Sequence, residues 1–391
     1  MKYKNNRAAG LISWTFIALV FAAIAVSGCS MMPSWLGGSS AVEKPKPAEL
    51  APNAALISVR LAWTARVGQV GFPLSVSVNG NTVAVASSDG SVIALDGATG
   101  RDLWRASAGG PIAAGVGSDG KLAAVITASN EVVAFSGGKQ AWRQKLGAQG
   151  YTAPFVAGDR VFVLAADRSV SAFDGQTGHK LWTQRRPGEP LVLRQAGVML
   201  AVGDTLVAGL GGRMVGLNPI NGSIRWEAAI ATPRGTNDIE RLVDLVGRTS
   251  RVGNVVCARA FQASVGCVDA VRGTVLWTKA ANGADGVHGD GETVYGTESD
   301  GKVVAWRRDT GERAWTSDRL LHRGLTAPLA VGRSVVIGDS TGLVHLLSRV
   351  DGTPLTRLST DGTAVAASPV LAGNTLVVVT QGGGIYGFVP E

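Results

Sequence analysis

Few side chains in this sequence have the types and spacings that carry out catalysis or bind metals. The four histidines lie far apart, at His179, His288, His322 and His345. None falls in a metal-ligand spacing such as HExxH, and the sequence has no paired CxxC motif. It also lacks the Walker A loop that cradles phosphates. We therefore predict a non-enzymatic protein with no catalytic residues, metal or cofactor, in which the histidines are structural or surface residues.

Two cysteines, Cys257 and Cys267, flank a predicted hairpin turn around Phe261-Gln262-Ala263. If Ala260 lies opposite Ser264, Cys257 lies directly opposite Cys267. Cross-strand Cβ atoms are about 4.5–5.5 Å apart, which allows a disulfide after a modest adjustment. A two-residue turn would instead place the cysteines on opposite faces, so buried thiols are the alternative. An oxidising compartment favours the bond.

The first 28 residues have the character of a secretory signal. Three positive residues precede an uncharged, mostly apolar run over residues 11–26, which is shorter than the ~20 residues of a membrane helix. The run ends in Val26-Ser27-Gly28-Cys29, which resembles the bacterial lipobox, where the signal is cleaved before a cysteine that then carries lipid. The resemblance implies acylation of Cys29, palmitate included. Because Ser30 rather than Asp follows, it also implies sorting to the outer membrane, with the protein on the periplasmic face.

Residues 29–56 are predicted to form the lipid anchor and a flexible tether. They contain Gly37-Gly38-Ser39-Ser40, Lys44-Pro45-Lys46-Pro47 and Pro52, without helical or alternating periodicity. A strand packed on the folded body is the alternative. The folded body would span residues 57–391.

The composition favours short strands joined by tight turns. Glycine accounts for 53 of 391 residues, about twice the usual share, and 17% of residues are charged, against about 25% in an ordinary domain. Only 15 prolines and a hydrophobic fraction of 46% exclude collagen and disorder.

The charge does not indicate a nucleic-acid partner. Signal cleavage would remove three of the 37 Lys and Arg residues, leaving 34 against 29 Asp and Glu. The arginines are scattered, without the basic runs and interleaved aromatics of a nucleic-acid groove. We predict a solvated surface and no nucleic-acid binding.

Tryptophan marks an internal repeat. Seven of the ten tryptophans recur at intervals of 38 to 51 residues, at positions 63, 104, 142, 182, 226, 277 and 315. Glycine stands four residues before six of them, and Gly352 stands four residues before Thr356, where the expected Trp is missing. The pattern indicates a strand, a turn with glycine at positive φ, and an outer strand whose Trp packs between neighbouring units. A period near 40 is typical of a β-propeller with one four-stranded blade per repeat.

The two ends of the repeat region complement each other. Trp63 has no preceding turn glycine, and Ile385-Tyr386-Gly387-Phe388 matches the third strand of a repeat just before the chain stops. Pairing the first strand with the last closes a ring and removes an exposed sheet edge. We predict an all-β, eight-bladed propeller of four-stranded antiparallel blades, closed by the N-terminal strand in the last blade.

The repeat resembles the propeller of the PQQ-type quinoprotein dehydrogenases. Those enzymes use vicinal cysteines beside the quinone, and this chain has no Cys-Cys pair and is much shorter. A PQQ-type oxidoreductase is therefore the alternative function, together with another periplasmic propeller that binds partners.

The lipobox, tether and propeller together resemble the BamB family of lipoproteins of the outer-membrane β-barrel assembly (Bam) machinery. Further family-like segments are 191–194, 239–242, 320–328 and Gly338-Asp339-Ser340-Thr341-Gly342. The resemblance implies a scaffold that binds the periplasmic domains of BamA, and through it the Bam complex, and assists the folding and insertion of outer-membrane proteins. Direct contact with unfolded clients is left open.

The repeat spacing indicates a binding surface, with tolerated surface insertions as the alternative. The gaps after Trp182 and Trp226 are 44 and 51 residues, longer than the 38 to 41 elsewhere, so two adjacent inter-blade connectors are extended. The resemblance places docking residues there, namely Leu191, Leu193, Arg194, Glu240, Arg241 and Asp244. Val246 stands where the family has a second acid, which argues against a paired acidic site.

Overall fold

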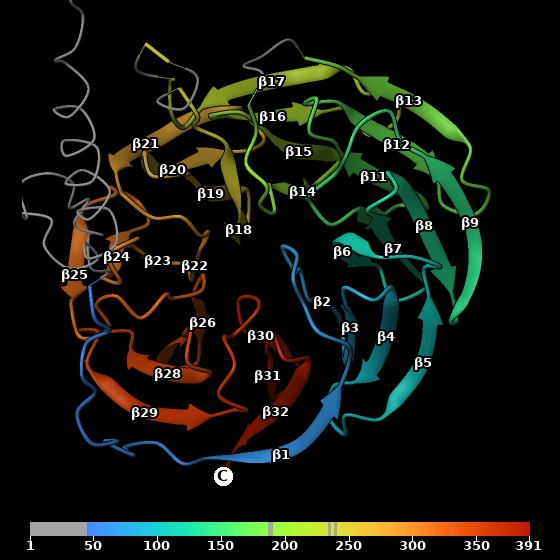
Figure 1. The fold of residues 1–391 in the computed structure, drawn as a ribbon. Helices are drawn as coiled ribbons and strands as arrows, with labels where there is room; N and C mark the ends of the chain where they lie inside the picture. Colours follow the sequence, from blue (N-terminus) through green and yellow to red (C-terminus); the bar gives the residue numbers. More distant parts are fainter. Residues whose placement is uncertain (1–44, 187–190, 234–235, 238–240) are drawn as a thin grey trace, which may run out of the picture. The chain divides into compact units, whose positions relative to one another are not determined.

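The computed structural model describes residues 45–186, 191–233, 236–237 and 241–391. These residues contain 32 β-strands, and no helix is found among them. The strands form eight four-stranded antiparallel sheets arranged as blades around a central axis (Figure 1). The predicted eight-bladed propeller is therefore confirmed. No helix in the described part of the chain is long and apolar enough to cross a membrane.

The blades follow one another along the chain, and their strands have the following bounds. Blade 1 is β2 (Ser77–Asn79), β3 (Thr82–Ala86), β4 (Ser91–Asp96) and β5 (Asp102–Ser107). Blade 2 is β6 (Ile112–Ser118), β7 (Leu122–Thr127), β8 (Glu131–Ser136) and β9 (Lys139–Lys145). Blade 3 is β10 (Phe155–Ala157), β11 (Arg160–Leu164), β12 (Val170–Asp174) and β13 (Lys180–Gln184). Blade 4 is β14 (Met199–Val202), β15 (Thr205–Leu210), β16 (Arg213–Leu217) and β17 (Ile224–Ala229). Blade 5 is β18 (Leu245–Val252), β19 (Val255–Ala260), β20 (Ser264–Asp269) and β21 (Thr274–Ala280). Blade 6 is β22 (Val287–Gly289), β23 (Thr293–Thr297), β24 (Val303–Arg307) and β25 (Arg313–Ser317). Blade 7 is β26 (Leu329–Val331), β27 (Ser334–Gly338), β28 (Leu343–Ser348) and β29 (Pro354–Ser359). Blade 8 is β30 (Val370–Ala372), β31 (Thr375–Val379), β32 (Gly384–Pro390) and β1 (Val59–Arg66).

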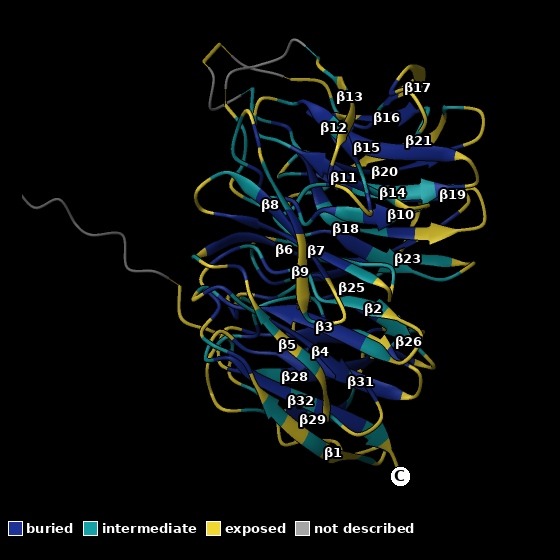
Figure 2. Ribbon diagram, turned by 90° about the vertical axis from the view of Figure 1, so that its right-hand side faces the viewer, coloured by how far each residue is buried: buried dark blue, intermediate teal, exposed yellow. Residues whose placement is uncertain are grey.

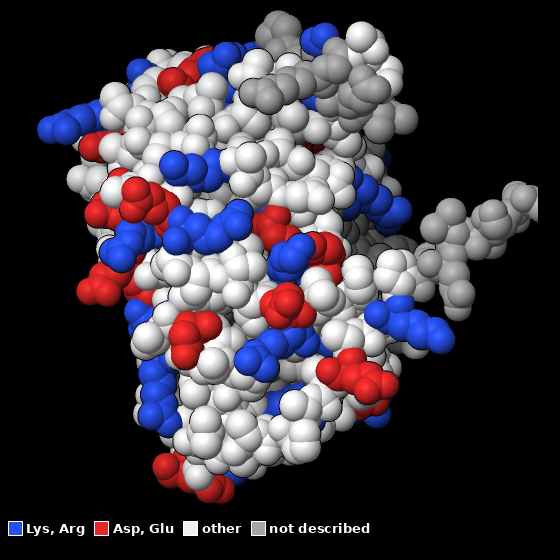
Figure 3. Space-filling view, turned by 90° about the vertical axis from the view of Figure 1, so that its left-hand side faces the viewer, with Lys and Arg blue, Asp and Glu red and all other residues white. Residues whose placement is uncertain are grey.

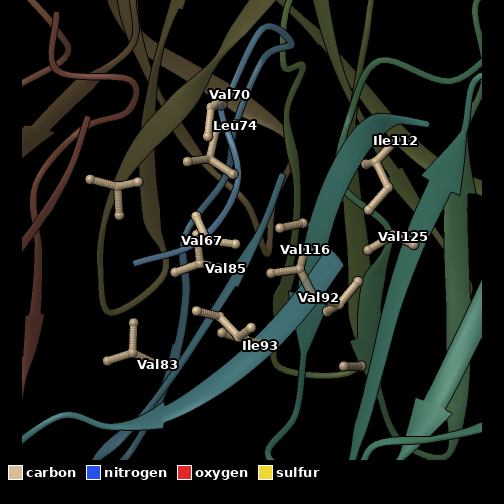
Figure 4. Close-up of a cluster of buried hydrophobic side chains, with 14 of the residues drawn as sticks. Val67, Val70, Leu74, Val83, Val85, Val92, Ile93, Ile112, Val116 and Val125 are labelled. Carbon is tan, nitrogen blue, oxygen red and sulfur yellow. The ribbon is translucent and has the colours of Figure 1, made fainter. Parts of the chain in front are cut away.

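Burial decreases from the middle of each blade to its outer edge (Figure 2). The second and third strands, such as β3 and β4, are buried on both faces because each blade packs between two others. They therefore consist of continuous Val, Ile, Ala and Leu runs. The outer strands, such as β5, alternate between exposed and half-buried residues. Figure 4 shows the interface of blades 1 and 2, where Val85, Val92 and Ile93 pack towards Val116 and Val125.

Each repeated tryptophan packs on the turn glycine of the next blade. A Cβ built on Gly100 would lie 2.5 Å from the Trp63 ring, and one on Gly311 would lie 2.6 Å from the Trp277 ring. These glycines have positive φ values of 70° and 69°, so both the backbone conformation and the close approach of the ring require glycine. The Trp63 Nε1 also donates to the Gly97 carbonyl at 3.0 Å. The Trp–Gly spacing of the sequence thus describes contacts between blades.

The ring is closed by the first strand. β1 pairs antiparallel with β32, from Val59 opposite Pro390 to Arg66 opposite Gly384. The missing Trp at Thr356 has a structural reason, because the next blade along is blade 8. The outer strand of blade 8 is β1, from the other end of the chain, so no turn with a glycine joins the third and fourth strands of this blade and no such glycine receives a tryptophan ring.

The tether boundary predicted at residue 56 is too late. We call residues 47–56 the strap. The Ala48 N–H donates to the Leu321 carbonyl at 2.9 Å, and the Leu56 N–H donates to the Leu355 carbonyl at 2.7 Å. Leu50 packs against the core shared by blades 6 and 7. The strap therefore lies along blade 7 beside β29, and the packed unit begins at Pro47. Residues 1–44 lie outside the described part of the chain, so the predicted signal and the lipidation at Cys29 do too.

Charges are interspersed over the side of the propeller that Figure 3 shows, with Lys and Arg next to Asp and Glu. Ion pairs between neighbouring charges are found in several blades, such as Arg349 with Asp290 and Arg105 with Asp102. On this side the surface agrees with the predicted scatter of basic residues and shows no extended patch of one sign.

Candidate functional site

The two long connectors lie on the same face of the propeller. Within each blade the chain reverses direction at every strand, so the inter-blade connectors and the turn between the second and third strands emerge together. We call this side the connector face. Residues 185–198 join blade 3 to blade 4, and residues 230–244 join blade 4 to blade 5. The extended connectors are thus neighbours, as the repeat spacing predicts.

Asp244 holds the two connectors together. Its Oδ2 accepts the Leu193 N–H at 2.8 Å, which links the second connector to the first. Its Oδ1 forms an ion pair with Arg168 at 3.3 Å, and both side chains are largely buried. The Arg168 Nη2 also donates to the Leu191 carbonyl at 2.9 Å. We call Arg168, Asp244 and the backbone of 191–193 the clasp.

The sequence reasoning missed Arg168. It lies in the hairpin between β11 and β12 of blade 3, at φ +61°. Gly90 and Gly301 occupy the matching position in the Asp-Gly turns of blades 1 and 6, with φ values of 100° and 92°. An arginine in place of glycine at positive φ strains the backbone, and such strain often marks a functional position. Aligning the hairpin turns of the repeats would have revealed this signal.

The clasp presents some predicted docking side chains to solvent and buries others. Leu191 is 42% exposed, and Arg194 is also exposed. Leu193 is half-buried and lines a small cavity of about 50 Å³ together with Tyr151 and Leu164. Leu191 and Arg194 are therefore available to a partner, whereas Leu193 supports the connector from beneath.

The remaining predicted docking residues belong to the second connector. Glu240 lies outside the described residues. Arg241 is described, and its N–H donates to the Asn237 carbonyl at 3.2 Å. Val246, where the resemblance implied a second acid, is only 2% exposed in β18. The described part of the connector therefore contributes one acid to the site, Asp244, and the clasp already engages it.

The two cysteines form a disulfide in the structure. Ala260 pairs with Ser264 and Cys257 lies opposite Cys267, with their Cα atoms 4.0 Å apart. Both cysteines are fully buried in the core between blades 5 and 6. The Arg308 Nη1 lies 3.2 Å from the Cys257 sulfur. The pair thus has a structural setting, away from the connectors.

A Ser-His-Asp grouping in blade 7 is structural as well. Gly338-Asp339-Ser340-Thr341-Gly342 has the GxSxG spacing of a nucleophile elbow, but it forms a hairpin turn between two strands and not a strand-to-helix turn. The Ser340 Oγ donates to the Arg323 carbonyl at 2.8 Å. The His345 Nε2 lies 3.0 Å from Asp339. The serine is therefore bonded to backbone and not to the histidine, as nucleophilic catalysis would require.

Asp339 instead ties the strap to blade 7. Burial acts to raise the pKa of Asp339, but hydrogen bonds from His345, Leu343 and Arg323 outweigh it and hold the pKa well below its usual range. Arg323 donates to Asp339 at 2.8 Å and to the Ala48 carbonyl of the strap at 3.0 Å. The cluster is a buried ion pair with a structural function.

A channel of about 950 Å³ runs along the propeller axis. Arg248, Asp285 and His288 line it. Burial raises the pKa of Asp285 to about 6, although the nearby charge of Arg259 acts in the opposite direction. Arg259 itself is fully buried, with an ion pair to Glu298 at 3.0 Å. No group of three or more potential metal ligands is found among the described residues.

Comparison with known proteins gives a consistent result. Residues 88–317 match the family model described as "Outer membrane protein assembly factor BamB". A protein of that name from Burkholderia pseudomallei is 41% identical over 88% of this chain and 92% of its own length. One from Bordetella pertussis is 37% identical over 95% of this chain and 96% of its own length.

Solved structures agree on the fold. The crystal structure of BamB from Moraxella catarrhalis has a TM-score of 0.78 at 24% identity, covering 85% of this chain and all of that one. A quinohemoprotein alcohol dehydrogenase from Pseudomonas putida has a TM-score of 0.66 at 14% identity, covering 86% of this chain and 77% of that one. Likenesses at these identities show a shared propeller and nothing about activity.

Proposed function

This chain belongs to the BamB family of outer membrane protein assembly factors, and on that premise we propose that its connector face is a docking site within the β-barrel assembly complex. The protein is a non-enzymatic scaffold that is associated with the outer membrane on its periplasmic side. Its relatives at 37–41% identity are named as assembly factors. The quinoprotein dehydrogenases are similar to this chain in fold alone.

The clasp is the observation that supports this site. It joins elements of blades 3, 4 and 5 and fixes the backbone of 191–193, so that Leu191 and Arg194 are held on a rigid support. A fixed support lowers the entropy cost of binding, because the connector does not have to become ordered when the partner arrives. An exposed leucine beside an exposed arginine suits an apolar pocket with a carboxylate at its edge.

We propose the periplasmic domains of BamA as the partner. Family resemblance supports this assignment, and the chemistry of the surface is compatible with it. Leu191 would desolvate apolar surface on BamA, and Arg194 would pair with an acidic or carbonyl group. Assistance to unfolded outer-membrane proteins would then follow from holding the complex together.

A paired substitution tests the docking site. In Leu191→Ala with Arg194→Ala, we expect binding to purified BamA periplasmic domains to weaken by roughly thirtyfold or more, the usual loss at a hot spot. The melting temperature should stay unchanged, because both side chains are exposed.

The matched control is Leu276→Ala with Arg272→Ala. Leu276 is 47% exposed on β21, and Arg272 is exposed at a turn opposite the connector face. This variant should bind BamA like the parent. If the Leu191/Arg194 variant is folded and binds as tightly as its control, the docking site lies elsewhere.

We also propose a lipid anchor at Cys29, since the sequence before it resembles a lipobox. The residue lies outside the described part of the chain, so the sequence alone supports this anchor. Cys29→Ala should release folded protein from the membrane fraction and remove the acyl mass in mass spectrometry. Membrane-bound, acylated Cys29→Ala protein would show that the signal was misread.

A further inference from the structure

The axial channel opens on the connector face. Its lining includes residues of five inter-blade connectors, at Leu74, Gln195, Ala284, Gly324 and Ala364, and of two hairpin turns on the same face, at Ser340 and Gln381. Its volume of about 950 Å³ lies in the range of pockets that hold small molecules. The docking function proposed above does not use this channel.

An arginine crosses the channel without a carboxylate partner. The Arg248 Nη1, from β18 of blade 5, donates to the Pro369 carbonyl at 2.9 Å and to the Ser368 Oγ at 3.3 Å. Both acceptors lie at the end of the connector that leads into blade 8, three blades away around the ring. Among the described residues no Asp or Glu forms an ion pair with Arg248, and its Nε and Nη2 have no hydrogen-bond acceptor. Burial lowers its pKa to about 10, and no acidic group acts to raise the pKa again.

A second donor lies near this guanidinium. The His288 Nδ1 accepts the Ala330 N–H at 3.0 Å, so the proton of the neutral ring is on Nε2. Burial and the positive charges of Arg248 and Arg308 lower the pKa of His288 to about 3, which keeps the ring neutral at physiological pH. No acceptor for Nε2 is found in the described part of the protein. Arg248 and His288 therefore both offer unused N–H groups in the channel.

The rest of the channel lining is mostly uncharged, with polar and apolar surface in nearly equal shares. Leu74, Val198, Leu325 and Val365 contribute aliphatic side chains. Asp285 is an acid on the same wall, but the charge that acts on it is that of Arg259 and not that of Arg248. A guanidinium and a neutral imidazole donor beside these aliphatic side chains match a molecule with an anionic head and an apolar body.

We propose that the axial channel binds a small organic oxyanion, a carboxylate or phosphate carried on an apolar body, with Arg248 and His288 donating to the oxyanion. The Arg248 Nη1 keeps its bonds to Ser368 and Pro369, and Nε and Nη2 hold the ligand. Such a ligand would lie between blades 5 and 8 and brace the ring across its centre.

Binding of simple probes tests this site on the full folded protein. Isothermal titration with benzoate and with phenyl phosphate, at ionic strength matched with KCl, should give saturable binding, and the tighter probe identifies the head group. Neutral benzamide should bind at least tenfold more weakly than that probe. Arg248→Gln should lose roughly tenfold or more in affinity, because a charge-assisted hydrogen bond is removed, and Arg248→Lys should fall between it and the parent.

The control is Arg251→Gln, on the same strand. Arg251 also donates to backbone carbonyls, those of Ala201 and Gly253, but it lies away from the channel and should not affect binding. If Arg248→Gln does not fold, Ala367→Phe, which narrows the channel beside Ser368 and leaves Arg248 in place, should reduce probe affinity by a similar factor. The proposal is overturned if neither anion binds more tightly than benzamide, or if folded Arg248→Gln or Ala367→Phe binds the anions like the parent.

Discussion

Arg168 shows how one residue can link the repeat to the partner site. It occupies a hairpin position that suits glycine, at φ +61°, and its side chain forms the ion pair with Asp244 and the bond to the Leu191 carbonyl. A positive φ costs a non-glycine residue about 1 kcal/mol or more. The backbone strain at Arg168 therefore lowers the stability of the fold, and its side-chain contacts raise it. Only the contacts position the docking connector.

Replacing this arginine by glycine separates the two effects. Arg168→Gly relieves the strained backbone but removes the clasp. We expect a shift of melting temperature of only a few degrees, because the relieved strain offsets part of the lost ion pair. Affinity for the BamA periplasmic domains should fall about tenfold, because the 191–193 backbone loses its support. Thermal unfolding and titration of the partner measure the two quantities.

Asn130→Gly is the matched control for the clasp. Asn130 occupies the equivalent hairpin of blade 2 at φ +61°, with no contact to either long connector in the described residues. It should gain stability without change in partner binding. An Arg168→Gly protein that binds like the Asn130→Gly protein would mean that the clasp does not position the docking residues.

Asp285 gives a prediction about pH. Burial raises its pKa in the folded protein to about 6, from 3.8 when exposed. The folded state therefore binds more protons between these pH values, so stability falls as pH rises from about 4 to 6, and above that the loss is complete. Asp285→Asn should remove this loss. Its free energy of unfolding in urea, relative to that of the parent, should therefore be higher at pH 7.5 than at pH 4.5.

Asp204 should behave in the opposite way. A hydrogen bond and the charge of Arg225 lower the pKa of this exposed acid below 3.8. Its contribution to stability is present above that pH and is lost as pH falls further, so Asp204→Asn should lose slightly more stability relative to the parent at pH 7.5 than at pH 3. An Asp285→Asn advantage that does not grow with pH would contradict the assigned burial of that carboxyl.

At the scale of the elements, the strands whose contacts come from a pattern within the sequence could be predicted. The Trp–Gly spacing identified the outer strands because each Trp ring needs a glycine on the next blade, as Trp63 needs Gly100. Counting residues across a turn gave the pairing of Cys257 with Cys267 as one of two registers, and the structure has that register. In both cases neighbours in the sequence determine the contact.

The strap and the clasp depend on contacts that no repeat encodes. The backbone of Ala48 bonds to the Leu321 carbonyl and to the Arg323 side chain, more than 270 residues away in the chain, and any residue at position 48 would supply the same backbone atoms. The prolines of this segment indicate an extended chain, and they do not indicate what it packs against. Similarly, Asp244 was recognised as an acid in a connector, but its internal partner Arg168 lies in another blade.

At the scale of the whole molecule, closure of the ring depends on pairing the two ends of the folded chain. β1 pairs with β32 over the full length of the strand, and Trp63 packs on Gly100 of blade 1. The split blade could be predicted because each end lacked what the other supplied. The interface between blades 7 and 8 differs from the others, since Thr356 replaces the tryptophan and the strap lies beside it.

Stepwise N-terminal truncation separates the strap from the closing strand. A variant beginning at Pro47 should unfold like the mature protein, because it keeps the strap. A variant beginning at Ile57 loses Leu50 and the strap hydrogen bonds, and we expect it to be less stable by about 1–3 kcal/mol.

A variant beginning at Val67 also loses β1 and Trp63, which leaves β32 as an open sheet edge. Removing a packed tryptophan alone costs about 3–5 kcal/mol, and an open edge promotes aggregation. Urea unfolding and light scattering measure both effects. If the variants beginning at Ile57 and Val67 are equally stable and monomeric, the first strand does not close the ring.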